Sequence, residues 1–194
     1  MSVARQPASP DRLTYEQYLA EEETNRRYEI VDGERFFMTN PTRRHQEILL
    51  NIAEALRAYE RVSQRGQTII APCDILIRRR PLQIRQPDVL FISREQLAQC
   101  SADTDPTPLE AAPELVIEIL SPSETRRIRE EKLDDYGAVG VQECWVVDPE
   151  AETIEVIRLR GKEREVIGAY GPGETLRSAV FPDLSVPVAA AFAR

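Results

Sequence analysis

The chain has 194 residues, of which 42% are hydrophobic and 30% charged, so it has the size and composition of one globular domain and not of a disordered protein. No run approaches the roughly eighteen apolar residues of a membrane span. The N-terminus also lacks an apolar signal core, so we expect a cytoplasmic protein without membrane association. The formal net charge of −8 argues against a protein that coats nucleic acid electrostatically, but local arginine clusters and bound cations still permit nucleic-acid binding.

The N-terminal part of the chain predicts an arm, a short helix and a hairpin. Residues 1–12 are polar and contain two prolines, which indicates a flexible arm ahead of a single domain over residues 13–194. Thr14 is a typical N-cap for the helix-forming segment that follows it. Asp32–Gly33 separates YEIV from ERFFM and tolerates the positive φ of a tight turn, so these segments predict a β-hairpin.

A long helix is predicted from Asn40–Pro41, with Asn40 as its cap and Pro41 in its first turn. Apolar residues recur in it at helical spacing: Ile48, Leu49, Ile52, Leu56 and Tyr59. Gly66 is expected to end the helix. Three strand-like segments follow and suggest a meander: Thr68–Ile70, Cys73–Ile77 and Ile84–Ile92.

The second half of the chain predicts a β-α-β unit and a terminal hairpin. ELVIEIL concentrates β-branched residues and is the expected central strand. Ser121–Pro122–Ser123 begins a helix through about Val139, and Gly140 allows the turn into the strand ECWVVD. TIEVIRL and EREVIGAY then alternate as a hairpin, and the apolar LSVPVAAAF is expected to dock on the body. The order of elements predicts an α/β fold.

Glu118 does not fit an ordinary place in the central strand. The pleat puts it on the face of Val116 and Leu120, between two apolar neighbours. In a strand covered by helices on both faces, an uncompensated carboxylate costs roughly several kcal/mol. A cation or hydrogen-bond donors are therefore expected beside Glu118, and an edge-facing or salt-bridged glutamate is the purely structural alternative.

Lys132 is the second unusual residue, because helical spacing aligns it with the apolar stripe of its helix, Ile128, Tyr136 and Val139. A lysine on an inward face requires an anionic partner. Glu118 is the natural candidate, since a helix that follows a strand folds back over the sheet. Alternatively, the lysine stem packs in the core while its ammonium reaches water.

Asp88 is the third unusual residue, an acid in the strand-like run IRQPDVLFI. Pro87 removes a ladder donor and indicates an edge, a bend or a bulge, where a side chain can be directed into a cleft. Two strand acids with a nearby lysine predict a site for Mg²⁺ or Mn²⁺, which prefer hard oxygen ligands.

The order of these features resembles the PD-(D/E)xK nuclease superfamily and, more narrowly, the Uma-two family of restriction endonucleases. The resemblance runs from about Leu13 to Val188. It is carried by six segments: YEIVDGE, NPTRRH, QPDVLFIS, ELVIEILSPS, EEKLDDYGAVGVQECWVVDP and FPDLSV. It implies a restriction-endonuclease-like α/β fold, with a mixed central sheet flanked by helices and with N-terminal and C-terminal β-hairpins.

The resemblance implies a role for each site residue. Asp88 takes the aspartate of the PD motif and Glu118 the acid of the (D/E)xK motif. Leu120 stands where the usual lysine would be, so the relocated helical lysine of the family falls on Lys132. His45 and Glu29 fall on family-typical positions near the site.

The activity that follows is hydrolysis of DNA phosphodiester bonds by a metal-dependent endonuclease, with a homodimer as the expected assembly. Mg²⁺ (or Mn²⁺) would be held by Asp88, Glu118 and the backbone carbonyl of Ile119, while Lys132 orients water or stabilises developing charge. Four arginines near the starts of the two helices are expected to contact phosphates: Arg43, Arg44, Arg126 and Arg127.

Two residues depart from the pattern of the family and keep other functions open. Ile128 stands where the family often has aspartate, and Cys144 where it usually has tyrosine. One alternative is therefore a catalytically impaired nucleic-acid-binding or dimeric interaction protein with the same fold. Another is a hydrolase of a different phosphoester, because a fold does not determine a substrate.

Overall fold

The computed structural model describes residues 12–21, 27–100 and 108–194. Its helices are α1 (Tyr15–Leu19), α2 (Arg43–Ser63), α3 (Arg94–Leu97), α4 (Arg126–Val139) and α5 (Val188–Ala191). Its strands are β1 (Tyr28–Val31), β2 (Glu34–Phe37), β3 (Gly66–Ile70), β4 (Ile75–Arg79), β5 (Leu82–Arg85), β6 (Val89–Ser93), β7 (Leu115–Ile119), β8 (Glu143–Asp148), β9 (Thr153–Arg160), β10 (Glu163–Tyr170), β11 (Thr175–Arg177) and β12 (Ser185–Pro187).

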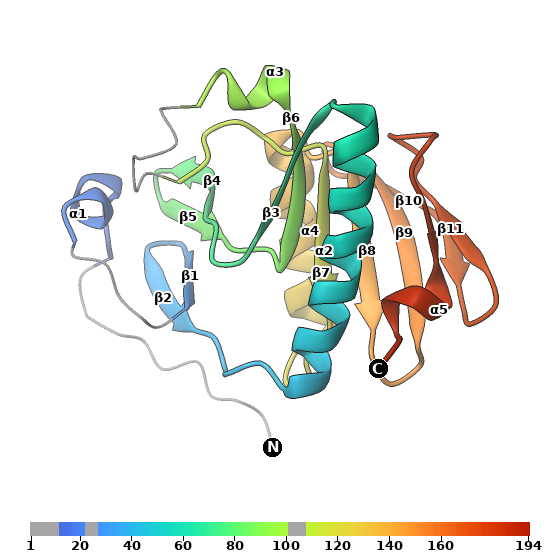
Figure 1. The fold of residues 1–194 in the computed structure, drawn as a ribbon. Coiled ribbons are helices and arrows are strands. Elements are labelled where there is room, and N and C mark those ends of the chain that lie inside the picture. The colour runs from blue at the N-terminus through green and yellow to red at the C-terminus, as the bar shows by residue number, and fades with distance from the viewer. Residues whose placement is uncertain (1–11, 22–26, 101–107) are drawn as a thin grey trace.

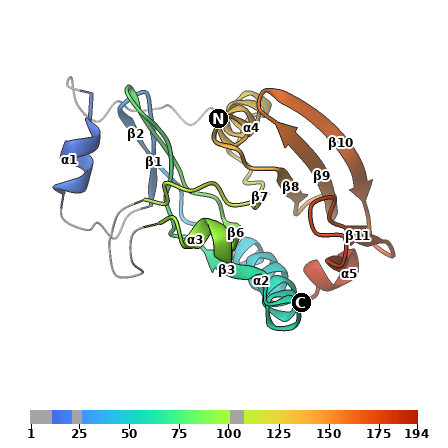
Figure 2. The same ribbon diagram turned by 90° about the horizontal axis from the view of Figure 1, so that it is seen from above.

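The described strands form a six-stranded sheet in the order β10-β9-β8-β7-β6-β3, a four-stranded sheet in the order β2-β1-β5-β4, and the pair β11-β12. In the six-stranded sheet β7 and β8 are parallel and every other neighbouring pair is antiparallel. Helices α2 and α4 lie on opposite faces of this sheet (Figures 1 and 2). The predicted mixed central sheet flanked by helices is therefore confirmed.

The β-α-β unit consists of β7, α4 and β8, and the sequence predicted it correctly. Helix α4 begins later than expected, because Thr125 is its N-cap and accepts a hydrogen bond from the Ile128 N–H. Gly140 ends the helix with φ at 102°, a left-handed conformation that favours glycine. The unit places the first turns of α4 beside the end of β7.

Helix α2 also begins and ends at other residues than predicted. Thr42 is its N-cap, because the Thr42 hydroxyl accepts the N–H of His45 over 3.1 Å. At the other end Gln64 takes the left-handed conformation with φ at 55°, and Gly66 is already the first residue of β3. The predicted inward face is correct, since Ile48, Leu49, Ile52 and Leu56 are buried, and Tyr59 is partly buried and packs against the same core.

The predicted meander is wrong, because the segment Ile84–Ile92 divides between two sheets. Its first part lies in β5, which pairs with β1 and β4, whereas its second part is β6, which pairs with β3 and β7. Pro87 lies between the two strands and has no N–H for a ladder. Asp88 is thereby placed at the junction of the two sheets, next to the first residue of β6.

Two core clusters on the faces of the six-stranded sheet confirm the predicted pleat of β7. Leu115, Ile117 and Ile119 pack in the cluster that contains the apolar face of α2. Val116 packs in the other cluster, with Leu133 of α4. Glu118 therefore lies on the face that α4 covers.

Both predicted hairpins are present, β1 with β2 and β9 with β10. The C-terminal segment docks on α2 as expected, where Arg44 donates to the Phe192 carbonyl over 2.9 Å and Asn51 donates to the Ala191 carbonyl over 3.2 Å. No helix in the described ranges is both long and apolar enough to cross a bilayer. The division into an arm and one domain stays a prediction, and residues 1–11 of the arm lie outside the described residues.

Candidate active site

Glu118 and Lys132 form a buried ion pair between β7 and α4. The Lys132 Nζ lies 2.8 Å from Glu118 Oε2, and Lys132 and Glu118 are only 4% and 5% exposed. The lysine therefore does not extend to water, and the predicted pairing is present. The Tyr136 hydroxyl, one turn further along α4, donates to the other Glu118 oxygen. Both carboxylate oxygens of Glu118 thus accept hydrogen bonds from the same helix.

Three carboxylates surround the Lys132 ammonium. Besides Glu118, it lies 3.5 Å from Glu29 Oε1 and 3.6 Å from Glu124 Oε2. Burial acts to lower the pKa of Lys132, but the carboxylates outweigh burial and raise that pKa above its usual value. Lys132 is therefore a charged donor at neutral pH.

Glu29 reaches this site from β1, in the other sheet. Arg85 donates to Glu29 Oε2 over 2.8 Å, and the Gln86 N–H donates to Oε1 over 3.4 Å. Burial acts to raise the pKa of Glu29, but the charges of Lys132 and Arg85 hold it below its usual value. Arg85 also donates to Asp135 of α4 over 2.7 Å, so a chain of ion pairs connects the four-stranded sheet with α4.

Asp88 approaches the end of β7 from the junction of the two sheets. Its Oδ2 accepts the Ile119 N–H over 2.9 Å and lies 3.2 Å from His45 Nε2, while its Oδ1 lies 3.5 Å from Arg27 Nη2. Burial acts to raise the pKa of Asp88, but His45 and the Ile119 N–H lower it overall. Asp88 therefore contacts the residue that follows Glu118 in the chain.

Glu118 is the acid of this cluster whose charge is least favoured. Burial raises the pKa of Glu118 to about 7 against the opposing charge of Lys132, and the charges of Asp88 and Glu124 contribute to the rise. Glu29, Asp88, Glu118 and Glu124 are four acids, and the lysine and arginines in ion pairs with them are three: Lys132, Arg85 and Arg27. A site with this excess of carboxylate favours the arrival of a cation.

The oxygen ligands of Asp88, Glu118 and Ile119 are of the type that a hard divalent cation prefers. Asp88 and Glu118 offer carboxylate oxygens and Ile119 a backbone carbonyl, and Mg²⁺ is commonly held by one or two carboxylates together with waters and phosphate oxygens. No group of three His, Cys, Asp or Glu residues within the described ranges is arranged to hold a metal ion. Binding at Glu118 also requires that an oxygen be released by Lys132 or Tyr136.

The arginines expected to contact phosphates lie outside this cluster. Arg126 and Arg127 are exposed and pair with Glu130 and Glu131 one turn along α4. Arg43 is also exposed, at the start of α2. Arg44 instead donates to the Phe192 carbonyl of the C-terminal segment. It also bonds to Glu152, in the connection between β8 and β9, over 3.1 Å.

Sequence reasoning missed several residues that complete the cluster. Tyr136 had a visible signal, since it lies four residues after Lys132 on the same helical face. Arg85, Arg27 and Glu124 had none, because they belong to other segments and reach the site only through tertiary packing. Of the two residues that depart from the family pattern, Ile128 is half-buried and Cys144 packs in the α4-side core.

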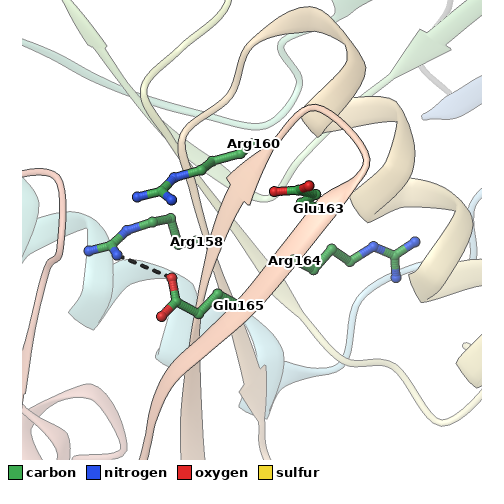
Figure 3. A pocket seen from close by; sticks show the side chains of 5 residues that line it. All are labelled: Arg158, Arg160, Glu163, Arg164 and Glu165. Atoms are coloured by element: carbon green, nitrogen blue, oxygen red, sulfur yellow. Dashed lines mark hydrogen bonds and ion pairs between the residues drawn. The ribbon is translucent and has the colours of Figure 1, made fainter.

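A pocket of about 110 Å³ lies on the β9–β10 hairpin (Figure 3). It is lined by Arg158, Arg160, Glu163, Arg164 and Glu165. Arg158 bonds to Glu165 over 3.2 Å, and Arg164 pairs with Asp134 of α4. None of the acids around Lys132 lines the pocket, so it is a separate surface feature that carries charges of both signs.

Comparison with known proteins supports the fold and identifies the family. Among solved structures, the fold is similar to a crystal structure described as a "putative nuclease belonging to DUF820" from Anabaena variabilis ATCC 29413, with a TM-score of 0.76 and 18% sequence identity. The match covers 93% of this chain and 97% of that chain. No curated protein matches this chain.

A family model matches residues 14–189, which include every residue of the cluster around Lys132 and Asp88. That family is Uma2, described as "Putative restriction endonuclease". The match spans the β-α-β unit, the first hairpin and the junction that carries Asp88. Because the match extends over nearly the whole chain, the protein belongs to the Uma2 family.

Proposed function

We propose that the protein is a metal-dependent endonuclease that hydrolyses DNA phosphodiester bonds at the cluster of Asp88, Glu118 and Lys132. The observation that carries the proposal is the buried Lys132–Glu118 pair at 2.8 Å. This pair sits beside Asp88, which accepts the N–H of Ile119. A buried lysine that faces three acids is costly for stability alone, and such clusters are characteristic of functional sites. Membership of the Uma2 family supports the same chemistry.

Mg²⁺ or Mn²⁺ is the proposed cofactor, held by Asp88, Glu118 and the Ile119 carbonyl. When bound, it would polarise a non-bridging phosphate oxygen and lower the pKa of a bound water. Lys132 donates hydrogen bonds to the phosphate as negative charge develops. His45 orients Asp88 through the 3.2 Å contact, and Glu29 keeps the Lys132 ammonium in the site.

DNA is the proposed substrate, and exposed arginines beside the site are the proposed backbone contacts. Arg126 and Arg127 stand in the first turn of α4, and Arg43 in the first turn of α2, where helix N-termini favour phosphate. Arg44 has less freedom, because it already bonds to the C-terminal segment. The homodimer and the cytoplasmic location stay predictions from the sequence.

The test is a plasmid-nicking assay with purified protein and Mg²⁺ or Mn²⁺. Wild type should nick supercoiled DNA, and Lys132→Ala and Glu118→Gln should lose the activity while keeping a folded circular-dichroism spectrum. Lys162→Ala is the matched control, because Lys162 is an exposed lysine in the turn between β9 and β10. Full activity in the two site variants would exclude this site.

A catalytically impaired nucleic-acid-binding protein is the second candidate. One observation favours it: both oxygens of Glu118 already accept hydrogen bonds from α4, from Lys132 and from Tyr136. Metal titration separates the two functions. Saturable Mn²⁺ binding that is lost in Asp88→Asn supports the nuclease, whereas DNA binding that is independent of metal and without cleavage supports the binding protein.

A further inference from the structure

Glu124 is a buried acid that the proposed roles of Asp88, Glu118 and Lys132 leave without a function. It lies in the connection between β7 and α4, where its N–H donates to the Ser121 carbonyl over 3.0 Å. Its side chain is 10% exposed, and its Oε2 lies 3.6 Å from Lys132 Nζ. Its other oxygen, Oε1, is buried and has no hydrogen-bond partner among the described residues.

An unpaired buried carboxylate oxygen is unfavourable, since the group has lost its hydration and gained no donor. Neighbouring acids differ in this respect. Both oxygens of Glu118 accept hydrogen bonds, and so do both oxygens of Glu29. A native protein retains such an atom where a ligand or water supplies the missing donor. Glu124 Oε1 is therefore placed to accept a hydrogen bond from a molecule that enters the site.

The chemistry of phosphodiester hydrolysis identifies this donor. A scissile phosphodiester group carries only acceptor oxygens around phosphorus, so it has no hydrogen to donate to a carboxylate. The attacking water carries two O–H groups. Lys132 does not compete for the role of proton acceptor, because its ammonium faces three carboxylates and acts as a donor.

Two other buried polar atoms near Asp88 also lack a hydrogen-bond partner among the described residues, Arg27 Nη2, which is in an ion pair with Asp88, and His45 Nδ1. The guanidinium of Arg27 has donors only and cannot take a proton. The ring of His45 contacts Asp88, whereas Glu124 contacts Lys132, the residue that would face the phosphate. Among these atoms, Glu124 Oε1 is the carboxylate acceptor on the lysine side of the site.

We propose that Glu124 is the catalytic proton acceptor of this enzyme, whose Oε1 binds and orients the water that attacks the phosphodiester. The inference rests on the proposed nuclease function. As the water oxygen forms its bond to phosphorus, one water proton passes to Glu124, and the bond between phosphorus and the leaving deoxyribose oxygen breaks. Solvent water protonates the leaving oxygen, and Glu124 returns its proton to solvent. The products are a phosphomonoester and a free hydroxyl.

The decisive variant is Glu124→Gln, which preserves the size of the side chain and removes its capacity to accept a proton. General-base catalysis typically contributes about 10²–10⁴-fold, so single-turnover nicking should slow by about that factor. Mn²⁺ affinity measured by calorimetry and DNA affinity measured in Ca²⁺ should both stay at wild-type values. The melting temperature should change little, because the substitution removes an unpaired charged oxygen together with one of the three carboxylates that face Lys132.

Glu54→Gln is the matched control, since Glu54 is an exposed acid of α2 that belongs neither to the cluster nor to the arginine pairs of α4. It should nick at the wild-type rate. Glu124→Ala offers a second measurement: added formate should restore turnover to this variant and not to Lys132→Ala. Rescue by a small carboxylate is expected of a missing proton acceptor and not of a lost structural contact.

The possible results separate this inference from the function on which it rests. Wild-type rates in Glu124→Gln, with an active wild type, would overturn the role of Glu124 and leave the nuclease in place. Loss of Mn²⁺ binding in Glu124→Gln would overturn it in favour of a metal ligand. A wild type that binds Mn²⁺ and DNA without cleaving would overturn both the nuclease and its proton acceptor.

Discussion

Tyr136 donates its hydroxyl to the Glu118 oxygen that Lys132 does not contact, so one helix satisfies the whole carboxylate from two successive turns. Glu118 lies on a strand whose residues are all buried, and no water is needed to complete its hydrogen bonds. The same arrangement places two protein donors where a cation would bind. Stability without metal and affinity for metal are therefore expected to oppose each other at this residue.

The Lys132–Glu118 pair is expected to be strongly coupled. Lys132→Met leaves buried acids without their cation and should lower the free energy of unfolding by about 3–5 kcal/mol in urea titrations. Glu118→Gln alone should also destabilise. The double variant should lose less than the sum of the two losses, because it leaves fewer unpaired ions than Lys132→Met alone, with Glu118 no longer charged. Additive losses would contradict the coupling.

Stability should depend on pH through Glu118. Its pKa rises from 4.5 in the unfolded chain to about 7 in the folded protein. The contribution of Glu118 to the free energy of unfolding is therefore complete below pH 4.5 and is lost as pH rises through 7. Metal-free wild type should thus lose on the order of 3 kcal/mol from Glu118 across this window. Glu118→Gln should flatten the profile there, as urea unfolding at a series of pH values can show.

Acid should destabilise the protein through different residues. Folding lowers the pKa of Glu29 and that of Asp88. The stability that these two carboxylates contribute is therefore present above their pKa values in the unfolded chain, and it declines as pH falls through their pKa values in the folded protein. Glu118→Gln should leave this loss of stability at low pH, the acid limb of the profile, unchanged. Asp88→Asn should reduce it. An acid limb that Asp88→Asn leaves intact would show that Asp88 is not stabilised as a carboxylate.

Tyr136→Phe should separate the cost of the hydrogen bond from its effect on metal binding. Removing the hydroxyl leaves Glu118 Oε1 without its donor, so the metal-free protein should lose about 1–3 kcal/mol. Mn²⁺ affinity should rise, because one oxygen is released in advance. Tyr59→Phe is the control, since the Tyr59 hydroxyl is buried without a partner among the described residues and its removal should cost little. Unchanged Mn²⁺ affinity in Tyr136→Phe would contradict the competition.

Arg126 and Arg127 should contribute to DNA affinity without sequence preference. Each pairs with a glutamate on an exposed helix face, and such pairs are weak, on the order of 0–1 kcal/mol, so phosphates can replace them. The double alanine variant should weaken DNA binding in Ca²⁺. It should also reduce the slope of the logarithm of the binding constant against the logarithm of the salt concentration by about two. Arg158→Ala, on the β9–β10 hairpin, is the comparison variant. An unchanged slope would place the DNA elsewhere.

Local sequence patterns determined much of this protein. The dipeptide Asp32–Gly33 specifies the first hairpin, and Gly140 specifies the end of α4. Periodicity alone directed Glu118 and Lys132 toward a shared interior, because the pleat and the helical repeat decide which face each side chain occupies. The acid and the lysine of the candidate site therefore follow from local sequence alone.

Tertiary packing decided the remainder, because it brings together segments that no local pattern relates. The division of Ile84–Ile92 between two sheets depends on which strands are available as partners, and that division placed Asp88 beside Ile119. Glu29 reaches Lys132 only because the four-stranded sheet lies next to α4, and Glu124 reaches it only through the path of a loop. The sequence alone showed that Glu118 and Lys132 needed compensating charges, whereas the fold determined which residues supply them and which oxygen remains unpaired.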